Sequence, residues 1–218
     1  MKVNGTLAAL AADTAHDLHD EAALRRIYST GPSDTSLAKV ADHVHALYRP
    51  YIEMSPFAVL ATLGAEGLDT LPRGDAPGFV KVVDAHTVLL PDRRGNQRID
   101  SLRNIVHDPR VALLFLIPGA AEALRVNGSA RISAFLALCE ALAVDGKAPA
   151  SVLVIHVRSV YFQCARAIKR SGLWNPAQHV AAGTLPSPGA ILECLSLDSI
   201  DGAAYDAALP ARQDATLY

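Results

Sequence analysis

Arginines gather in one short stretch of this chain, where a predicted strand is followed by a predicted helix. Of the fifteen arginines in the 218 residues, five lie between Arg93 and Arg110. Guanidinium groups make bidentate, charge-assisted hydrogen bonds to phosphate oxygens, and the first turn of a helix offers free backbone N–H groups to an anion. The stretch therefore predicts a binding site for a phosphorylated small molecule.

The charge of the whole chain favours such a small ligand over a polyanion. The formal net charge is −2 and 19% of the residues are charged, so the sequence offers no broad basic surface for nucleic acid or an anionic membrane. Hydrophobic residues make up 50% of the chain, which is enough for a sizeable core. We expect no nucleic-acid partner and no membrane association.

Apolar runs and cysteines indicate the compartment. No apolar run approaches the roughly 18 residues of a membrane span, and the run at residues 7–12 is short for a signal peptide. Cys139, Cys164 and Cys194 are widely spaced and odd in number, which suits reduced thiols. We expect a cytoplasmic protein.

Short apolar segments at hairpin spacing follow residue 56. Strands are predicted over 57–63, 68–73, 79–83, 87–90, 111–117, 124–133 and 151–162. Later helices are predicted over about 97–107, with Asn96 as the N-cap, and over 134–144, 163–171, 190–195 and 200–209. Several short strands with few helices between them favour an antiparallel barrel over a doubly wound parallel sheet.

The longest predicted helix precedes these strands. Apolar residues over 37–51 recur at three- and four-residue spacing, which is typical of an amphipathic helix. This helix is expected to begin near Asp34 and to end near Pro50 or Pro56.

We therefore expect a mainly β fold with flanking helices (α+β), organised in three parts. An N-terminal helical extension is predicted over residues 1–35 and the barrel over residues 36–176. A C-terminal helical segment over residues 177–218 is expected to pack on the barrel or on a dimer.

The histidines do not predict a metal site. His43 and His45 cannot both face one side of a helix, and His16 and His19 have no evident third ligand nearby in the sequence. We expect no bound metal.

Four blocks of sequence, in their order and spacing, resemble the pyridoxamine 5'-phosphate oxidase-like, FMN-binding split-barrel family. The blocks are 72–75, 90–104, 125–128 and 161–174. The resemblance covers roughly residues 55–176 and is greater to the uncharacterised branch of the family than to the true vitamin B6 oxidases. It implies a split β-barrel that forms a homodimer, with FMN bound at the subunit interface.

The resemblance also implies which residues contact the cofactor. Beside the isoalloxazine ring or the ribityl chain it places Arg73, Gly74, Asp75, Pro91 and Asp92. Around the phosphate it places Arg93 and Arg98, helped by Asn96, Ser101 and Asn104. From the partner subunit it brings Arg166, Arg170, Ser171 and Trp174.

Some positions depart from the family pattern. Gln163 and Arg166 stand where close relatives have His and Lys, and Gln97 stands where a second basic residue is common. Residues 211–218 do not match the arginine-containing segment by which the true oxidases grip their substrate. Oxidation of pyridoxamine phosphate is therefore not the expected activity.

The predicted function is that of an FMN-dependent oxidoreductase acting on an unknown small molecule. No catalytic acid or base is assigned, because flavin chemistry often needs none from the protein. Two alternatives remain open: a non-catalytic FMN-binding or sensing protein, and a split barrel that takes a deazaflavin or haem-type ligand.

Overall fold

The computed structural model describes residues 2–218, and the chain divides into two compact units, Met1–Lys39 and Val40–Tyr218. In its described residues the first unit contains three short helices, which are α1 Lys2–Ala11, α2 Glu21–Ile27 and α3 Asp34–Ala38. The N-cap residues of α2 and α3 are Asp20 and Ser33. Each favours the start of its helix because its side-chain oxygen accepts a hydrogen bond from a free N–H of the first turn.

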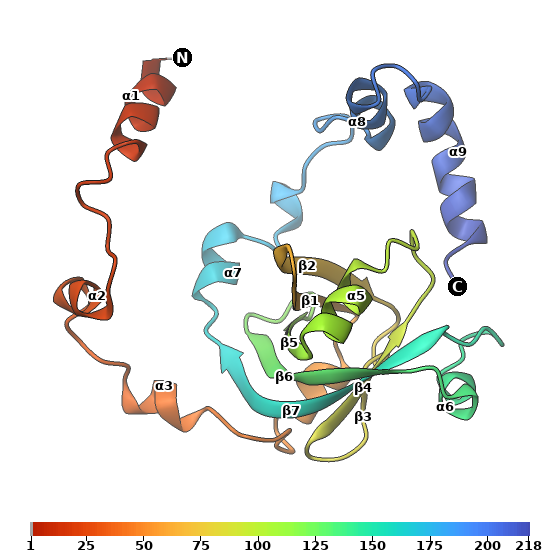
Figure 1. Cartoon of the computed structure of the whole chain (residues 1–218), viewed down its shortest axis with the longest axis horizontal. Coiled ribbons are helices and arrows are strands. Elements are labelled where there is room, and N and C mark those ends of the chain that lie inside the picture. The colour runs from red at the N-terminus through yellow and green to blue at the C-terminus, as the bar shows by residue number, and fades with distance from the viewer. Residues whose placement is uncertain (1) are drawn as a thin grey trace. The chain divides into compact units, whose positions relative to one another are not determined.

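The second unit is built on one seven-stranded sheet with the order β2-β1-β5-β6-β7-β4-β3 (Figure 1). The strands are β1 Phe57–Gly64, β2 Gly67–Gly74, β3 Lys81–Val82, β4 Thr87–Asp92, β5 Arg110–Leu116, β6 Ala123–Ser133 and β7 Ser151–Gln163. Every neighbouring pair is antiparallel. The prediction of a mainly antiparallel fold with flanking helices is therefore confirmed.

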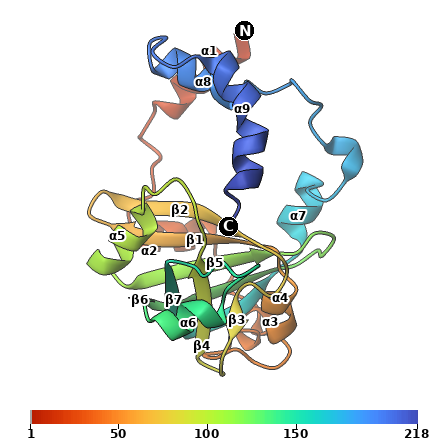
Figure 2. The ribbon, with the colours of Figure 1, turned by 90° about the vertical axis from the view of Figure 1, so that its right-hand side faces the viewer.

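Some helices of this unit pack on the sheet, whereas those near the C-terminus stand apart from it (Figures 1 and 2). The helices of this unit are α4 Arg49–Glu53, α5 Asp100–His107, α6 Leu136–Ala141, α7 Arg166–Ser171, the 3-10 helix Pro176–Gln178, α8 Pro188–Leu195 and α9 Gly202–Ala215. None of the helices in the described part of the chain is long and apolar enough to cross a membrane.

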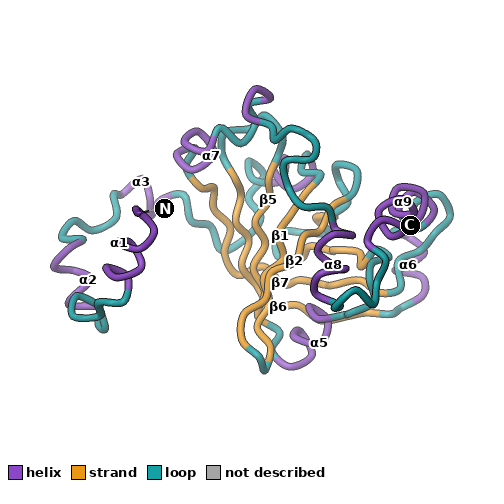
Figure 3. The backbone as a smooth tube through the Cα atoms, turned by 90° about the horizontal axis from the view of Figure 1, so that it is seen from above, coloured by secondary structure: helices purple, strands orange, loops and turns teal. Residues whose placement is uncertain are grey.

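The sheet is curved (Figure 3), and side chains on its inner face make the hydrophobic core. In β1 the buried positions alternate from Ala58 to Gly64, and β5 repeats the pattern at Val111, Leu113 and Phe115. This alternation follows from the period of two along a strand. The residues between them in β5 are half-buried rather than fully enclosed.

Backbone pairing does not close this sheet into a complete barrel, because β2 and β3 remain edge strands among the described residues. Ion pairs nevertheless join the ends of β2 and β4. Arg73 Nη2 lies 3.9 Å from Asp92 Oδ1, and Arg93 Nε donates to Asp75 Oδ2 at 2.8 Å. Side chains, rather than a ladder of backbone hydrogen bonds, connect these two strand ends.

The single long helix predicted from near Asp34 to Pro50 or Pro56 is wrong. Two short helices, α3 and α4, flank an irregular segment instead. Within that segment the backbone of Ala41 exchanges two hydrogen bonds with Val160, and the Val44 N–H donates to the Ala85 carbonyl. Tertiary hydrogen bonds to the sheet therefore override the local helical periodicity.

The predicted start of the helix at residue 97, capped by Asn96, is also wrong. The Asn96 Oδ1 atom accepts the Arg98 N–H at 3.1 Å, so this side chain stabilises the preceding loop. Ile99 has a left-handed backbone conformation, with φ of 53°, and α5 begins only at Asp100. Ser101 and Ile105 are the buried residues of this helix.

Candidate functional site

A pocket of about 770 Å³ lies between the ends of β2 and β4 and the loops that precede α5 and β7. Small-molecule sites usually have volumes of roughly 300–1,000 Å³. The predicted site residues that line this pocket are Arg73, Gly74, Pro91, Asp92, Arg93, Asn96, Arg98 and Ser101. The pocket thus brings together most of the residues expected from one chain.

One wall of the pocket is held by Arg73. Its guanidinium donates to Ser101 Oγ at 2.6 Å and also faces Asp92. Burial lowers the pKa of Arg73 and raises the pKa of Asp92, against the opposing effect of Arg73 on that carboxyl. This pair supplies one cation and one acid to the pocket, and it links β2, β4 and α5.

Asp75 lies next to the pocket and is nearly inaccessible, with 3% of its side chain exposed. It accepts hydrogen bonds from Arg93 Nε at 2.8 Å, from the Tyr218 hydroxyl at 2.6 Å and from the Ala76 N–H at 2.7 Å. Burial acts to raise the pKa of Asp75, but the hydrogen bonds from Tyr218, Ala76 and Arg93 together bring it below its ordinary value. The carboxylate is therefore ionised at neutral pH.

Arg93 is largely used by the protein itself. Besides its bond to Asp75, its Nη1 donates to the Leu142 carbonyl at 2.9 Å, and its guanidinium carbon lies 5.7 Å from the centre of the Tyr218 ring. Only 15% of the side chain is exposed. Arg93 thus fastens the segment after α6 to the ends of β2 and β4, in addition to lining the pocket.

The remaining cations of the pocket differ in their partners. Arg98 is 74% exposed and donates to Asp100 at 2.8 Å, and this hydrogen bond raises the pKa of Arg98. Arg94 and Lys147 also line the pocket, and neither side chain pairs with an acid among the residues that the structure describes. Two of the five cations are therefore not neutralised by the protein.

Asn104, predicted near the phosphate, lies outside the lining of the pocket. Its Nδ2 donates to Thr62 Oγ1 at 3.0 Å. A Cβ at Gly64 would come within 2.0 Å of Asn104 Oδ1, so the glycine makes room for this side chain. Asn104 joins α5 to β1.

Comparison with known proteins identifies the family of this chain. A family model described as "Pyridoxamine 5'-phosphate oxidase" matches residues 44–164, which is more than half of the chain. The chain belongs to the pyridoxamine 5'-phosphate oxidase family. The matched part contains all seven strands and every pocket residue except Tyr218.

Solved structures resemble part of the chain at low identity, and the TM-scores of the three that follow are below 0.5. HupZ of Group A Streptococcus is 22% identical, with 52% of this chain and 89% of that chain covered and a TM-score of 0.43. A Clostridium acetobutylicum protein related to general stress protein 26 is 15% identical, with 53% and 84% covered and a TM-score of 0.42. An FMN-binding protein of Syntrophomonas wolfei is 10% identical, with 52% and 78% covered and a TM-score of 0.39. No curated protein matches the chain.

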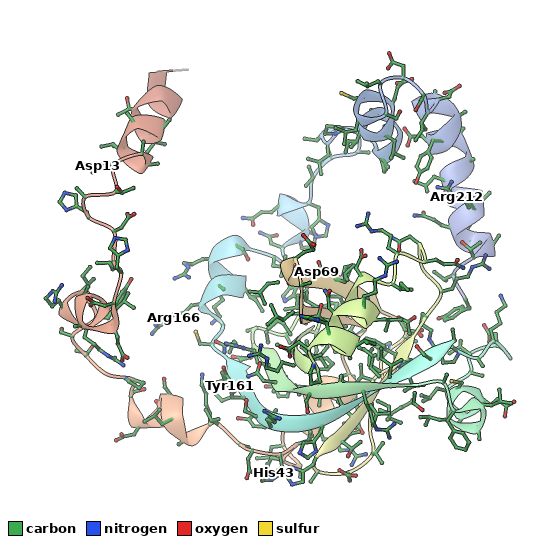
Figure 4. All side chains as sticks on the ribbon, in the orientation of Figure 1. Asp13, His43, Asp69, Tyr161, Arg166 and Arg212 are labelled. Atoms are coloured by element: carbon green, nitrogen blue, oxygen red, sulfur yellow. The ribbon has the colours of Figure 1, made fainter. Side chains whose placement is uncertain are left out.

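The four residues expected from a partner subunit lie on or after α7. They are Arg166, Arg170, Ser171 and Trp174, and none of them lines the pocket of their own chain. β7 begins at the pocket with Ser151, and α7 follows its other end, where Figure 4 shows Arg166. Trp174 Nε1 donates to the Ala120 carbonyl at 2.7 Å, which fastens the segment after α7. Their role in a partner's site stays a prediction.

Lys147 and Tyr218 are pocket residues that the sequence did not predict. β4 and β7 pair with Asp92 opposite Ser151, and this register brings the loop with Lys147 next to the segment after β4. Tyr218 reaches Asp75 across 143 residues of sequence. The only local sign that Lys147 could bind an anion is that it is a basic residue in a loop, next to Gly146. Nothing in the sequence around Tyr218 indicates a pocket residue.

Histidines gather elsewhere on the second unit. The ring centres of His43 and His86, and those of His86 and His156, are 6.0 Å apart. Among the described residues, however, no group of three or more His, Cys, Asp or Glu side chains is placed to hold a metal ion.

Proposed function

We propose that this protein binds FMN in the pocket between the ends of β2 and β4 and uses it as an oxidoreductase acting on a small organic molecule. Membership of the pyridoxamine 5'-phosphate oxidase family supports a phosphate-containing flavin. The observation that carries the proposal is the presence of two cations, Arg94 and Lys147, that line the pocket without an acidic partner.

The charges of the pocket suit a phosphate monoester. Such a group carries about −1.5 to −2 charges at pH 7. Arg73, Arg93 and Arg98 each face an aspartate, so Arg94 and Lys147 are the cations whose charge remains to be balanced. In this proposal they contact the phosphate directly, Arg98 adds to the local field, and Arg93 keeps the surrounding segments in place.

The remaining lining suits the flat, largely apolar ring system of a flavin. Binding sites combine apolar walls with a few polar groups that fix orientation. The apolar residues of this pocket are Leu71, Pro72, Phe79, Pro91, Ile99, Leu102 and Pro149. They offer the ring an apolar surface, while Arg73 supplies a hydrogen-bond donor beside it.

When bound, FMN would supply the two-electron redox chemistry, and the protein would supply binding, orientation and electrostatics. The Arg73–Asp92 pair orients polar edges of the ligand from β2 and β4. No side chain is assigned as a catalytic acid or base.

Titration with two flavins tests the proposal. Riboflavin lacks only the phosphate of FMN, so the purified protein is expected to bind FMN at least about a hundredfold more tightly, which corresponds to one charge-assisted contact from each of Arg94 and Lys147. Quenching of flavin fluorescence measures both dissociation constants. Equal affinity for the two flavins would contradict the assignment of the phosphate to Arg94 and Lys147.

The finer architecture that we propose is a homodimeric split β-barrel. Two observations support this. The edges of the sheet at β2 and at β3 are unpaired among the described residues, and the pocket of their own chain is not lined by Arg166, Arg170, Ser171 or Trp174. In the dimer these residues would complete the pocket of the partner. Light scattering is expected to give the mass of two chains at micromolar concentration, and a monomer mass would exclude the shared site.

A further inference from the structure

The helices α8 and α9 pack against each other, and the first turn of α8 contacts the first turns of α9 (Figures 1 and 2). A Cβ on Gly202 would lie 2.6 Å from the Gly189 carbonyl oxygen, so small residues let the two backbones touch. The Gly189 N–H also donates to Asp206 Oδ1 at 2.8 Å. The two helices pack mainly against each other rather than against the strands, and we call them the helical pair.

Tyr218, just after α9, connects this helical pair to the pocket. Its hydroxyl donates to Asp75 Oδ1 at 2.6 Å, and its ring lies beside the guanidinium of Arg93. Tyr218 is also one of the residues that line the pocket. One side chain thus contacts both members of the Arg93–Asp75 ion pair and the space proposed for the ligand.

We propose that Tyr218 is a positioning residue that fastens the α8–α9 pair at the pocket, so that the ligand associates and dissociates only when the Tyr218–Asp75 hydrogen bond opens. We call this hydrogen bond the latch. The proposal rests on the proposed function for the identity of the ligand, but the latch itself is a property of the chain.

The chemistry of the two groups makes the latch strong. Asp75 is ionised and almost fully enclosed, and a hydroxyl that donates to an enclosed carboxylate forms a charge-assisted hydrogen bond. Its acceptor is also fixed in place by Arg93 and by the Ala76 N–H. The closed position is therefore favoured, and opening is expected to limit the rate of ligand exchange.

Stopped-flow fluorescence with FMN tests the role of Tyr218 in exchange. In Tyr218→Ala the association and dissociation rates are both expected to rise about tenfold, the effect of losing one charge-assisted hydrogen bond. The association rate decides the test, because loss of a contact between the Tyr218 ring and the ligand would raise only the dissociation rate, whereas loss of the latch raises both rates. Tyr218→Phe keeps the ring beside Arg93 but lacks the hydroxyl, so most of the acceleration should remain.

Tyr205→Ala is the matched control. Tyr205 is also on α9, where its ring stacks with Arg212 at 4.4 Å, but it does not line the pocket. Its exchange rates should equal those of the unmodified protein. Unchanged rates in Tyr218→Ala would overturn the latch, and so would a weaker affinity with an unchanged association rate, since that result indicates a purely structural contact.

Hydrogen–deuterium exchange without any ligand separates this proposal from the proposed function. Amide exchange in residues 202–215 should be faster in Tyr218→Ala than in the unmodified protein, because the helical pair loses its hydrogen bond to Asp75. The increase in Tyr205→Ala should be smaller. If FMN fails to bind but this difference is found, the latch stands and the FMN assignment fails. If the amides are unaffected, the latch is refuted whatever the ligand.

Discussion

Replacing both unpaired cations of the pocket, in Arg94→Ala combined with Lys147→Ala, is expected to weaken FMN binding by at least about a hundredfold. Each cation should contribute a charge-assisted contact of about 1.5–3 kcal/mol with the phosphate, and 1.4 kcal/mol is about a factor of ten. Neither side chain pairs with an acid in the described part of the protein, so their removal leaves no aspartate without its partner. Fluorescence titration measures the loss.

Two comparisons make this prediction specific to the phosphate. Riboflavin affinity should be the same in the double variant and in the unmodified protein, because the missing contacts involve only the phosphate. Arg103→Ala is the control for a general loss of positive charge, since Arg103 lies exposed on α5 and outside the pocket lining. A double variant that binds FMN normally would place the phosphate elsewhere.

Replacing Asp75 by alanine should reduce the free energy of unfolding by about 3 kcal/mol. The change leaves the Arg93 side chain, which is 15% exposed, without its counter-ion, and breaking one partner of a buried ion pair commonly has an effect of this size. It also removes the acceptor of the Tyr218 hydroxyl and of the Ala76 N–H. Urea unfolding measures the difference.

Asp108→Ala is the matched control for this variant. Asp108 also pairs with an arginine, but Arg110 is 66% exposed, and an exposed ion pair contributes no more than about 1 kcal/mol. Asp75→Asn should recover part of the stability, because an amide oxygen can still accept the hydrogen bond from Tyr218. An Asp75→Ala protein as stable as Asp108→Ala would show that the pair does not hold the strand ends together.

The pKa of Asp75 also predicts how the stability of the fold changes with pH. The folded-state pKa of Asp75 lies below its ordinary value, so its stabilising contribution is complete above the unfolded pKa of about 3.9 and is lost as the pH falls through the folded value. Acidification below about pH 4 should therefore destabilise the unmodified protein more than Asp75→Ala.

The strands could be predicted because they are short apolar runs separated by turn residues, as in β1, where residues 57–63 are apolar except for Thr62 and Gly64 begins the turn. The region before them shows the limit of periodicity. Apolar residues over 37–51 have helical spacing, yet Ala41 and Val44 take hydrogen bonds to β7 and to the turn before β4. A pattern of side chains cannot reveal that the backbone has a competing partner more than a hundred residues away, as Val160 is for Ala41.

The candidate site was predictable where its residues are close in sequence. Residues 90–104 carry both the end of β4 and the start of α5, so their arginines were expected at one place. Which of these arginines is neutralised depends on Asp75, 18 residues from Arg93, and on the strand register that brings in Lys147. For this reason Arg94, which is not among the phosphate contacts expected from the sequence, becomes a candidate phosphate contact once the pairs are known.

The most direct test of the central claim is to purify the protein without added cofactor, record its visible spectrum and determine the mass of any molecule that it releases. We expect a yellow protein with the two-band absorption of oxidised flavin that releases FMN, up to one molecule per chain. A colourless protein that also fails to take up added FMN, or a released deazaflavin or haem-type ligand, would show that FMN is not the cofactor.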